Sequence, residues 1–434
     1  MTGGPNADPV HEAYAAWERC CRASSCRLQT GAERVGLIEA VGRVTAAPVR
    51  AIWSSPAHDL AAMDGIALRA ADTAGASSAT PVRLRAAAFH AVDTGDPLPP
   101  DRDAVVMREH VHERPDGTVE LFAAVGPGRH VRTLGEDVEA GELLLPAGHR
   151  IRPVDAAVAA AAGHTELAVR ARPVVAVLPT GDEVRPIGSQ PGRGEVIDTN
   201  SLMLAEQARD AGCAPITLPI VPDDPAELAA AVRAAADGAD LVLIIAGSSK
   251  GRDDHTVGVL ADLGHVAVHG AAIRPGHPVA LGVIANRADE RAVPAIGVPG
   301  YPVSAAHVFT VFALPMLQAM QNSTDRPAGV VTARLMHAVS SRVGVEETVL
   351  VRLEGLSAQG EVRAVPAGRG AGALSALMRA DGLLRIPAAS TGWPAGSHVP
   401  VQRLAGAPGF GEAEQPAPPS TTRAHRTIDT TVVA

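Results

Sequence analysis

The sequence predicts a multidomain protein whose centre is an α/β domain on a mostly parallel sheet, with β-rich parts before and after it. Between residues 173 and 320, short aliphatic runs alternate with helical patterns of apolar residues. Strands that alternate with helices form parallel sheets with helices on both faces. Hydrophobic residues make up 46% of the 434 residues but aromatic ones only 2%, so the cores are predicted to be aliphatic.

The first part of the chain is predicted to hold three helices and a strand. The patterns place helices at 9–26, 35–41 and 154–163, and a strand at 167–169. We assign residues 9–49 and 146–172 to one N-terminal linker domain, because a segment of different composition interrupts it.

Residues 50–145 are that segment, and they are predicted to form an inserted β-rich domain. Its β-prone runs lie at 82–84, 104–107, 119–122 and 143–145, separated by Gly, Pro and Asp turns. Two of its loops stand out, Ala62-Met63-Asp64-Gly65-Ile66-Ala67 and Asp93-Thr94-Gly95-Asp96-Pro97-Leu98-Pro99. Both are also good turn sequences, so simple turn formation is the alternative.

The α/β domain is predicted over residues 173–326. Its predicted strands are 174–178, 216–221, 241–246 and 293–298; its helices are 200–211, capped by Asn200 or Ser201, then 225–236, 256–263 and one that opens at Val303. Residues 327–404 are predicted to form a separate small β domain with late strands at 382–387 and 399–401. Residues 405–434 are predicted to be a disordered tail.

Charged residues gather in the loops that follow the predicted parallel strands. These loops carry the carboxylates of Asp182, Glu183, Asp223, Asp224, Asp253 and Asp254 and the cations of Lys250 and Arg252. Ligands of such sheets bind beyond the carboxyl ends of the strands, so the loops predict a site for a phosphate and a hard cation such as Mg²⁺. One residue of each adjacent acidic pair is expected to face the site. Solvated acidic loops are the alternative.

The stretch at 293–309 has the order strand, tight loop and helix start. Pro299 and Gly300 end the apolar run, and Pro302 and Ser304 lie in the first turn of the helix. Free backbone N–H groups at such a place favour an anion. A plain strand–helix connection is the alternative.

Several functions are disfavoured by composition and motifs. The net charge of −9 and the few aromatic residues argue against a nucleic-acid partner. No Walker A loop for a nucleoside triphosphate is found. No Gly-x-Gly-x-x-Gly opens a helix either, which disfavours a dehydrogenase. Cys20, Cys21, Cys26 and Cys213 match no zinc spacing and are predicted to be reduced thiols. No signal peptide or apolar run of about 18 residues is visible, so no membrane contact and a cytoplasmic location are expected.

Taken together, the motifs from residue 9 to 404 resemble those of the MoeA family, the molybdopterin molybdenumtransferases, which include the catalytic domain of gephyrin. The matching segments, in the family's order, are Met63-Asp64-Gly65, Thr94-Gly95-Asp96-Pro97-Leu98-Pro99, Gly135-Glu136-Asp137, Thr180-Gly181-Asp182-Glu183, Asp198-Thr199-Asn200-Ser201, the glycine–serine loop that ends at Asp253 and Asp254, Pro275-Gly276-His277-Pro278, and Pro299-Gly300-Tyr301-Pro302-Val303-Ser304.

The resemblance implies a fold and a reaction. It implies a molybdopterin-binding, MogA-like central domain, a barrel-like C-terminal domain, and a homodimer whose site lies between the α/β domain of one subunit and loops of the other. The reaction inserts molybdate into adenylylated molybdopterin with Mg²⁺ assistance and releases AMP. The residues implied for catalysis are Asp64, Thr94, Glu183, Asp224 and Asp254, the last three also as metal ligands. The residues implied for substrate binding are Gly247, Ser248, Ser249, Lys250, Arg274, His277, Pro299, Gly300, Pro302 and Ser304.

Three departures from the family pattern are present. His277 stands where the family usually has lysine, and Tyr301 where it has asparagine. The usual Gly-Gly-Val-Ser-x-Gly is Ala246-Gly247-Ser248-Ser249-Lys250-Gly251 here. Histidine is only partly protonated at pH 7, whereas lysine is fully charged. Lys250 and Arg252 are therefore expected to supply replacement charge. Two alternatives stay open: a non-catalytic molybdopterin-binding scaffold on the same fold, and an enzyme that inserts tungstate.

Overall fold

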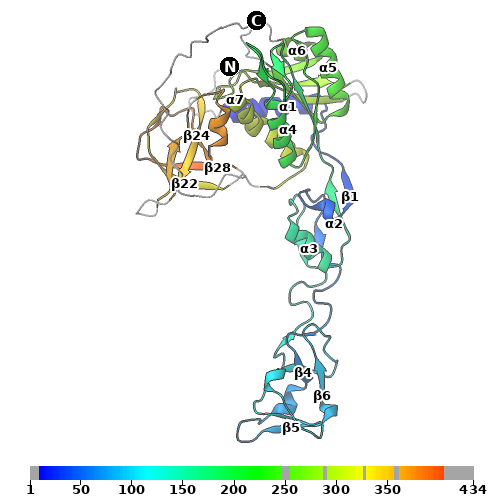
Figure 1. The fold of residues 1–434 in the computed structure, drawn as a ribbon. Helices are drawn as coiled ribbons and strands as arrows, with labels where there is room; N and C mark the ends of the chain where they lie inside the picture. Colours follow the sequence, from blue (N-terminus) through cyan, green and yellow to red (C-terminus); the bar gives the residue numbers. More distant parts are fainter. Residues whose placement is uncertain are drawn as a thin grey trace, which may run out of the picture.

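The computed structural model describes residues 9–246, 255–286, 291–325, 329–355, 361–368 and 370–404. The described chain is elongated (Figure 1). An α/β domain and a C-terminal barrel lie side by side at one end, and a β-rich module lies at the other. A narrow region with helices α2 (Leu37–Ala40) and α3 (Pro153–Ala161) joins them.

The first helix, α1 (Pro9–Ala23), packs in the core of the α/β domain, although we expected it to be part of the N-terminal domain. Trp17 is fully buried, and its Nε1 donates a hydrogen bond to the carbonyl of Gly282 at 2.7 Å. The predicted helix at 35–41 is wrong at its first two residues, because α2 begins at Leu37. Val35 belongs to strand β1 (Ala32–Gly36), which pairs antiparallel with β12 (Glu166–Arg170). Long-range pairing overrides the local helical pattern there.

The module contains short strands, as predicted. Its strands are β3 (Leu60–Ala61), β4 (Gly65–Leu68), β5 (Val82–Leu84), β6 (Phe89–Val92), β7 (Ala104–Met107), β8 (His112–Glu113), β9 (Val119–Leu121) and β10 (Val131–Arg132), with 3₁₀ turns at Ala70–Thr73, Ala86–Ala88 and Arg108–His110. They form two three-stranded sheets, β6-β4-β7 and β5-β9-β8, and the pair β10-β3. At the base of the module, β2 (Val49–Arg50) pairs with β11 (Leu143–Leu145).

The α/β domain is built on a six-stranded sheet of order β16-β13-β17-β21-β20-β18. The strands are β13 (Val174–Pro179), β16 (Ala214–Thr217), β17 (Leu241–Ala246), β18 (Gly264–His269), β20 (Ala280–Ala285) and β21 (Ala292–Pro299). The first four in the order run parallel. β20 is antiparallel to β21, and β18 is antiparallel to β20, so β18 runs in the direction of the first four. The prediction of a mostly parallel sheet is therefore confirmed. A small parallel pair, β14 (Val184–Arg185) and β15 (Val196–Ile197), projects beside it.

Helices cover both faces of this sheet. On one face lie α1, α4 (Asn200–Asp210) and the helix that begins at Pro302; on the other lie α5 (Pro225–Gly238) and α6 (Thr256–Leu263). Alternate residues of β17 enter the two cores, with Leu243 on one face and Ile244 on the other. A strand buried on both faces reads as a continuous apolar run, which is why its bounds were predicted correctly.

Two local predictions in this domain are wrong. The strand predicted at 216–221 is β16, which ends at Thr217. Helix α4 is not capped by the side chain of Asn200 or Ser201; instead, Thr199 is the residue before the helix, and Asp198 Oδ1 accepts a hydrogen bond from the Ser201 N–H at 3.0 Å.

The helix after the Pro299–Pro302 loop has three parts: α7 (Pro302–Val308), a π-helical turn (Phe309–Ala313) and α8 (Leu314–Met320). By length and composition, residues 302–320 could cross a membrane, contrary to our expectation that no segment of this kind exists. About 67% of the apolar window is buried inside the protein, so it is a core helix of the α/β domain.

The C-terminal domain is a closed five-stranded barrel, as predicted. Its strands are β22 (Val330–Leu335), β24 (Glu346–Glu354), β25 (Arg363–Pro366), β26 (Gly382–Ile386) and β28 (His398–Arg403), with the small pair β23 (Val339–Ser340) and β27 (Gly392–Trp393) and helix α9 (Leu374–Met378). The pairing of β24 with β26 closes the barrel. A strand of the α/β domain, β19 (Ile273–Arg274), adds parallel to β24.

Candidate active site

A cavity of about 690 Å³ lies at the carboxyl ends of the parallel strands of the α/β domain. It is lined by Pro179, Thr180, Glu183, Val184, Val196, Ile197, Asp198, Thr199, Asn200, Ile245, Ala246, Arg274, Pro275, Gly276, His277, Pro278, Pro299, Gly300, Tyr301, Pro302, Ser304, Ala371 and Gly372. Three adjacent strands, β13, β17 and β21, each end at this cavity. This is the place where ligands of open α/β sheets bind.

One wall is the loop from Pro299 to Ser304. Strand β21 ends at Pro299, and α7 begins at Pro302, so the predicted strand–loop–helix unit is present. Ser304 is only 3% exposed. The Val303 N–H, which we expected to be free for an anion, donates to the carbonyl of Ala371 at 2.9 Å. A segment that precedes α9 therefore accepts a hydrogen bond from one of the N–H groups at this helix start, and its residues Ala371 and Gly372 also line the cavity.

Asn200 is a cavity residue that sequence reasoning did not select. Its Nδ2 donates to the carbonyl of Gly300 at 2.7 Å and so fixes the loop after β21. Its Oδ1 is buried and has no hydrogen-bond partner among the described residues. A buried oxygen without a partner carries a desolvation cost unless a ligand donates to it. The Asp198-Thr199-Asn200-Ser201 motif is the sequence signal that could have identified it.

The segment after β19 forms another wall. Arg274 is exposed to the cavity, and the Nδ1 of His277 lies 2.6 Å from the carbonyl of Ala271, to which it must donate. Gly276 has a φ of +108°, and a Cβ at this position would lie 2.8 Å from Val308 Cγ2. Only glycine fits there, so the shape of this wall depends on Gly276.

The acidic loops are divided by the structure. Glu183 lines the cavity, together with Asp198. Asp182 and Asp223 lie outside it and face each other: the backbone N–H of each donates to the carboxylate of the other at 3.3 Å. Asp224 also lies outside the cavity lining. Its Oδ1 accepts hydrogen bonds from the N–H groups of Ala226 and Glu227, both at 2.9 Å, as the N-cap of α5.

The N-cap geometry of Asp224 gives a direct test of its role. Asp224→Asn is expected to keep the cap and the activity, because asparagine caps helices as well as aspartate. Asp224→Ala is expected to lower the free energy of unfolding by about 1 kcal/mol, because two N–H groups lose their acceptor. Thermal unfolding and turnover of both variants check this. Normal stability with lost activity in Asp224→Asn would instead support the predicted ligand role.

Asp64 and Thr94 are brought together, but in the β-rich module. Asp64 Oδ1 accepts hydrogen bonds from the Thr94 N–H at 2.8 Å and from the Thr94 hydroxyl at 2.9 Å. These bonds, the backbone one first, hold the pKa of the exposed Asp64 carboxyl below its usual value. Asp64 directly precedes β4, which lies at the opposite end of the chain from α7 and the cavity (Figure 1). It does not contribute to the cavity of its own chain.

Other predicted residues fall outside the described part of the chain. These are Gly247, Ser248, Ser249, Lys250, Arg252, Asp253 and Asp254. They follow Ala246, the last residue of β17 and a cavity residue. Among the residues that the structure describes, no group of three His, Cys, Asp or Glu side chains is arranged to hold a metal ion.

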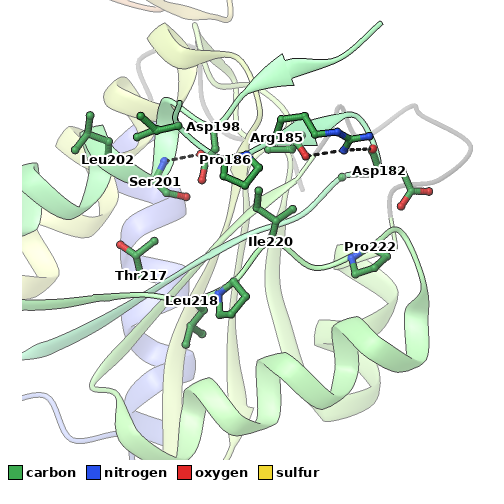
Figure 2. A pocket seen from close by; sticks show the side chains of 14 residues that line it. Asp182, Arg185, Pro186, Asp198, Ser201, Leu202, Thr217, Leu218, Ile220 and Pro222 are labelled. Atoms are coloured by element: carbon green, nitrogen blue, oxygen red, sulfur yellow. Dashed lines mark hydrogen bonds between the residues drawn. The ribbon is translucent and has the colours of Figure 1, made fainter. Parts of the chain in front are cut away.

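Figure 2 shows a second cavity, of about 710 Å³. Val184 and Asp198 line both cavities. Its other walls are mainly apolar, from Pro186, Ile187, Leu202, Leu218, Pro219, Ile220 and Pro222. Arg185 lies at its rim, where Nη1 donates to the carbonyl of Asp182 at 2.8 Å. The buried hydroxyl of Ser201 lines this second cavity and has no partner among the described residues.

The cavities lie in a fold that matches known sequence families along most of its length. Residues 9–163 match the MoeA N-terminal region (domain I and II), residues 176–319 match a probable molybdopterin binding domain, and residues 332–404 match the MoeA C-terminal region (domain IV). The residues that line the first cavity therefore all belong to the second region, except Ala371 and Gly372, which belong to the third.

Curated relatives and solved structures agree with these matches. The chain is 34% identical to a molybdopterin molybdenumtransferase of Haemophilus influenzae, over 67% of this chain and 74% of the relative. It is 34% identical to molybdopterin molybdenumtransferase 2 of Mycobacterium tuberculosis, over 69% of this chain and 79% of the relative. A crystal structure of a molybdopterin biosynthesis MoeA protein from Pyrococcus horikoshii has a TM-score of 0.75 and 31% identity, and covers 91% of this chain and 98% of its own.

Proposed function

This chain belongs to the MoeA family, and from that premise we propose that it inserts molybdenum from molybdate into adenylylated molybdopterin and releases AMP. It is a transferase of molybdenum cofactor biosynthesis, as its curated relatives are. One observation supports the assignment to the first cavity. The loop after β13, the Asp198–Asn200 segment, the segment after β19 and the loop after β21 all meet there, and each carries a family motif.

The described lining suits a substrate with phosphates and a polar ring. The guanidinium of Arg274 supplies donors for phosphate and molybdate oxygens, and the exposed ring of His277 lies in the same wall, with its Nδ1 bonded to the carbonyl of Ala271. Asn200, whose Nδ2 donates to the carbonyl of Gly300, keeps the loop after β21 in place beside the substrate. Lys250, as a further cation from the adjacent loop, stays part of the proposal.

Mg²⁺ fits the carboxylates of this cavity. In phosphate-processing sites it is commonly held by one or two carboxylates, with substrate phosphates and water as the remaining ligands. Glu183 and Asp198 both line the cavity and would serve as that pair, with Asp254 a proposed further ligand. When bound, Mg²⁺ supplies positive charge against the phosphates of the substrate.

Glu183 is also placed to move protons. The dithiol of molybdopterin must lose its protons when it takes up the metal, and oxygen that leaves molybdate must gain protons to depart as water. A carboxylate in the cavity can accept and return such protons. Arg274 and His277 meanwhile hold the anionic groups in position, which lowers the entropic cost of bringing two substrates together.

A homodimer is part of the proposal. Asp64 and Thr94 form a hydrogen-bonded pair on the far module, and they lie too far from their own cavity in the elongated chain to serve it. A symmetric partner would bring its module to this cavity and receive the reciprocal contact. We place the reaction in the cytoplasm, without a nucleic-acid or membrane partner.

The reaction itself tests this function. The purified protein is incubated with adenylylated molybdopterin and Mg²⁺, with molybdate, tungstate, sulfate or no oxyanion, and AMP is measured by chromatography. We expect AMP release with molybdate and none with sulfate. Faster release with tungstate would support the tungstate-inserting alternative. Tight binding of the pterin without AMP release under any condition would support a scaffold role.

A further inference from the structure

His307, a residue of α7 that does not line either large cavity, connects the first cavity to the C-terminal barrel. It is buried, with 7% of its surface exposed. Its Nδ1 lies 2.7 Å from the carbonyl of Pro275, and its Nε2 lies 2.9 Å from Oγ1 of Thr348. Pro275 lines the cavity, whereas Thr348 belongs to β24 of the barrel. One imidazole ring therefore bonds to both domains.

The two contacts require one tautomer. The carbonyl of Pro275 can only accept, so Nδ1 carries the proton, and Nε2 accepts from the hydroxyl of Thr348. Burial lowers the pKa of His307, and the nearby Arg385 guanidinium lowers it further. The hydrogen bond to the Pro275 carbonyl raises the pKa, but less than burial lowers it. Arg385 in turn pairs with Glu346 at 2.5 Å. The ring is thus neutral at pH 7, with both nitrogen atoms in use.

The same cavity wall is tied to the barrel at a second point. In β19, Ile273 and Arg274 pair with Glu346 and Glu347 of β24, and Thr348 is the next residue of that strand. The Glu346 N–H donates to the carbonyl of Ala272 at 2.9 Å. Glu346 and Glu347 of β24 therefore pair directly with Ile273 and Arg274. The next residue, Thr348, is linked to Pro275 through the ring of His307.

We infer that His307 is a positioning residue, which fixes the Pro275–Pro278 wall of the cavity against the barrel and so sets how Arg274 and His277 meet the anionic substrate. The inference rests on the proposed function, because it concerns that substrate. Without the His307 bond, the carbonyl of Pro275 loses its buried hydrogen-bond donor. The Pro275–Pro278 segment must then move until that carbonyl finds another donor.

Two amide substitutions separate the two contacts. In His307→Asn the side-chain amide reaches the place of Nδ1 and can still donate to Pro275, but it loses Thr348. In His307→Gln the amide reaches the place of Nε2 and can still accept from Thr348, but it loses Pro275. We expect the KM for adenylylated molybdopterin to rise about tenfold in His307→Gln and about threefold or less in His307→Asn, with kcat within about twofold in both.

A second measurement does not depend on activity. Hydrogen bonds inside the wall join Gly270 to Val279 and Ala271 to His277, so amide exchange over residues 270–279 reports whether the wall is held. We expect exchange there to accelerate about tenfold in His307→Gln and little in His307→Asn, while residues 174–179 of β13 stay unchanged in both.

The outcomes distinguish this inference from the proposed function. An inactive wild type would contradict the proposed function, and the exchange measurement would still decide the role of His307. Equal exchange over residues 270–279 in the wild type and both variants would overturn the inference. So would an equal loss of thermal stability in both variants with an unchanged KM, because His307 would then only support the fold.

Discussion

An equal mixture of Asp64→Asn and Glu183→Gln proteins is expected to regain activity that neither protein has alone. Each variant changes one carboxylate to its isosteric amide, so the fold is retained. Asp64 lies on the far module and Glu183 lines the cavity. If one subunit supplies Asp64 to the cavity of the other, a mixed dimer has one site with both carboxylates intact and one site with neither.

The size of the recovery follows from this arrangement. Random mixing makes about half of the dimers mixed, and one of their two sites is intact, so about a quarter of wild-type turnover is expected. The two variants are mixed under conditions that allow their subunits to exchange, and AMP release is then measured. Each variant incubated alone is the control. Sedimentation gives the mass of the active species. Activity in a monomer, or no recovery despite confirmed exchange of subunits, would contradict a shared site.

Gly276→Ala is expected to abolish most substrate binding and to destabilise the protein. Gly276 has a φ of +108°, a backbone conformation that residues other than glycine rarely adopt. The added Cβ would also lie 2.8 Å from Val308 Cγ2 and 3.2 Å from Ile273 Cδ1, inside the core beneath the cavity. Backbone strain and overpacking together are expected to cost about 2 to 4 kcal/mol of unfolding free energy. The displaced wall is expected to raise KM at least about tenfold.

Gly270→Ala is the matched control. Gly270 also has a positive φ, of +78°, and lies in the turn before β19, but the nearest atom to an added Cβ is 3.6 Å away. This variant is therefore expected to lose only about 1 kcal/mol, with KM close to that of the wild type. Chemical denaturation and steady-state AMP release measure both effects. Similar behaviour of the two variants would show that crowding at Gly276 does not shape the cavity.

The parts of the fold predicted well are those whose signal is local. Strand β17 was found with its full bounds, because Leu241 to Ala246 are all apolar and the strand is buried on both faces. Helix α6 was also found with its full bounds, from Thr256 to Leu263. The arrangement of strands and helices then implied the sheet edge at which Glu183 and the Pro299–Pro302 loop meet, whereas Arg274 was implied only by the family resemblance.

The parts that could not be predicted depend on contacts between distant residues. β19 is two residues long and pairs with the C-terminal barrel, so no pattern near Ile273 indicates it. The same holds for Ala371 and Gly372, which complete the cavity from a segment without regular periodicity. Val35 has the apolar spacing of a helix but pairs with Leu167 in a strand.

Asp224 and Asn200 show a different limit. An aspartate before proline at a helix start has the same sequence signature whether it caps the helix or binds a metal ion. Only the two hydrogen bonds from Ala226 and Glu227 identify the cap. Conversely, the sequence predicts a cap at Asn200 or Ser201, yet the side chain of Asn200 bonds to Gly300 in the wall of the cavity. Residue type alone does not separate capping from binding for these side chains.

The central claim is that molybdenum uptake and AMP release are one coupled event in the first cavity. Its most direct test measures both products in the same reaction, with adenylylated molybdopterin, molybdate and Mg²⁺, for the wild type and for folded Glu183→Gln. We predict that the wild type forms AMP and molybdenum-loaded pterin in equal amounts, and that Glu183→Gln forms neither at a comparable rate. AMP released at the same rate without molybdate, or wild-type amounts of both products from Glu183→Gln, would contradict the claim.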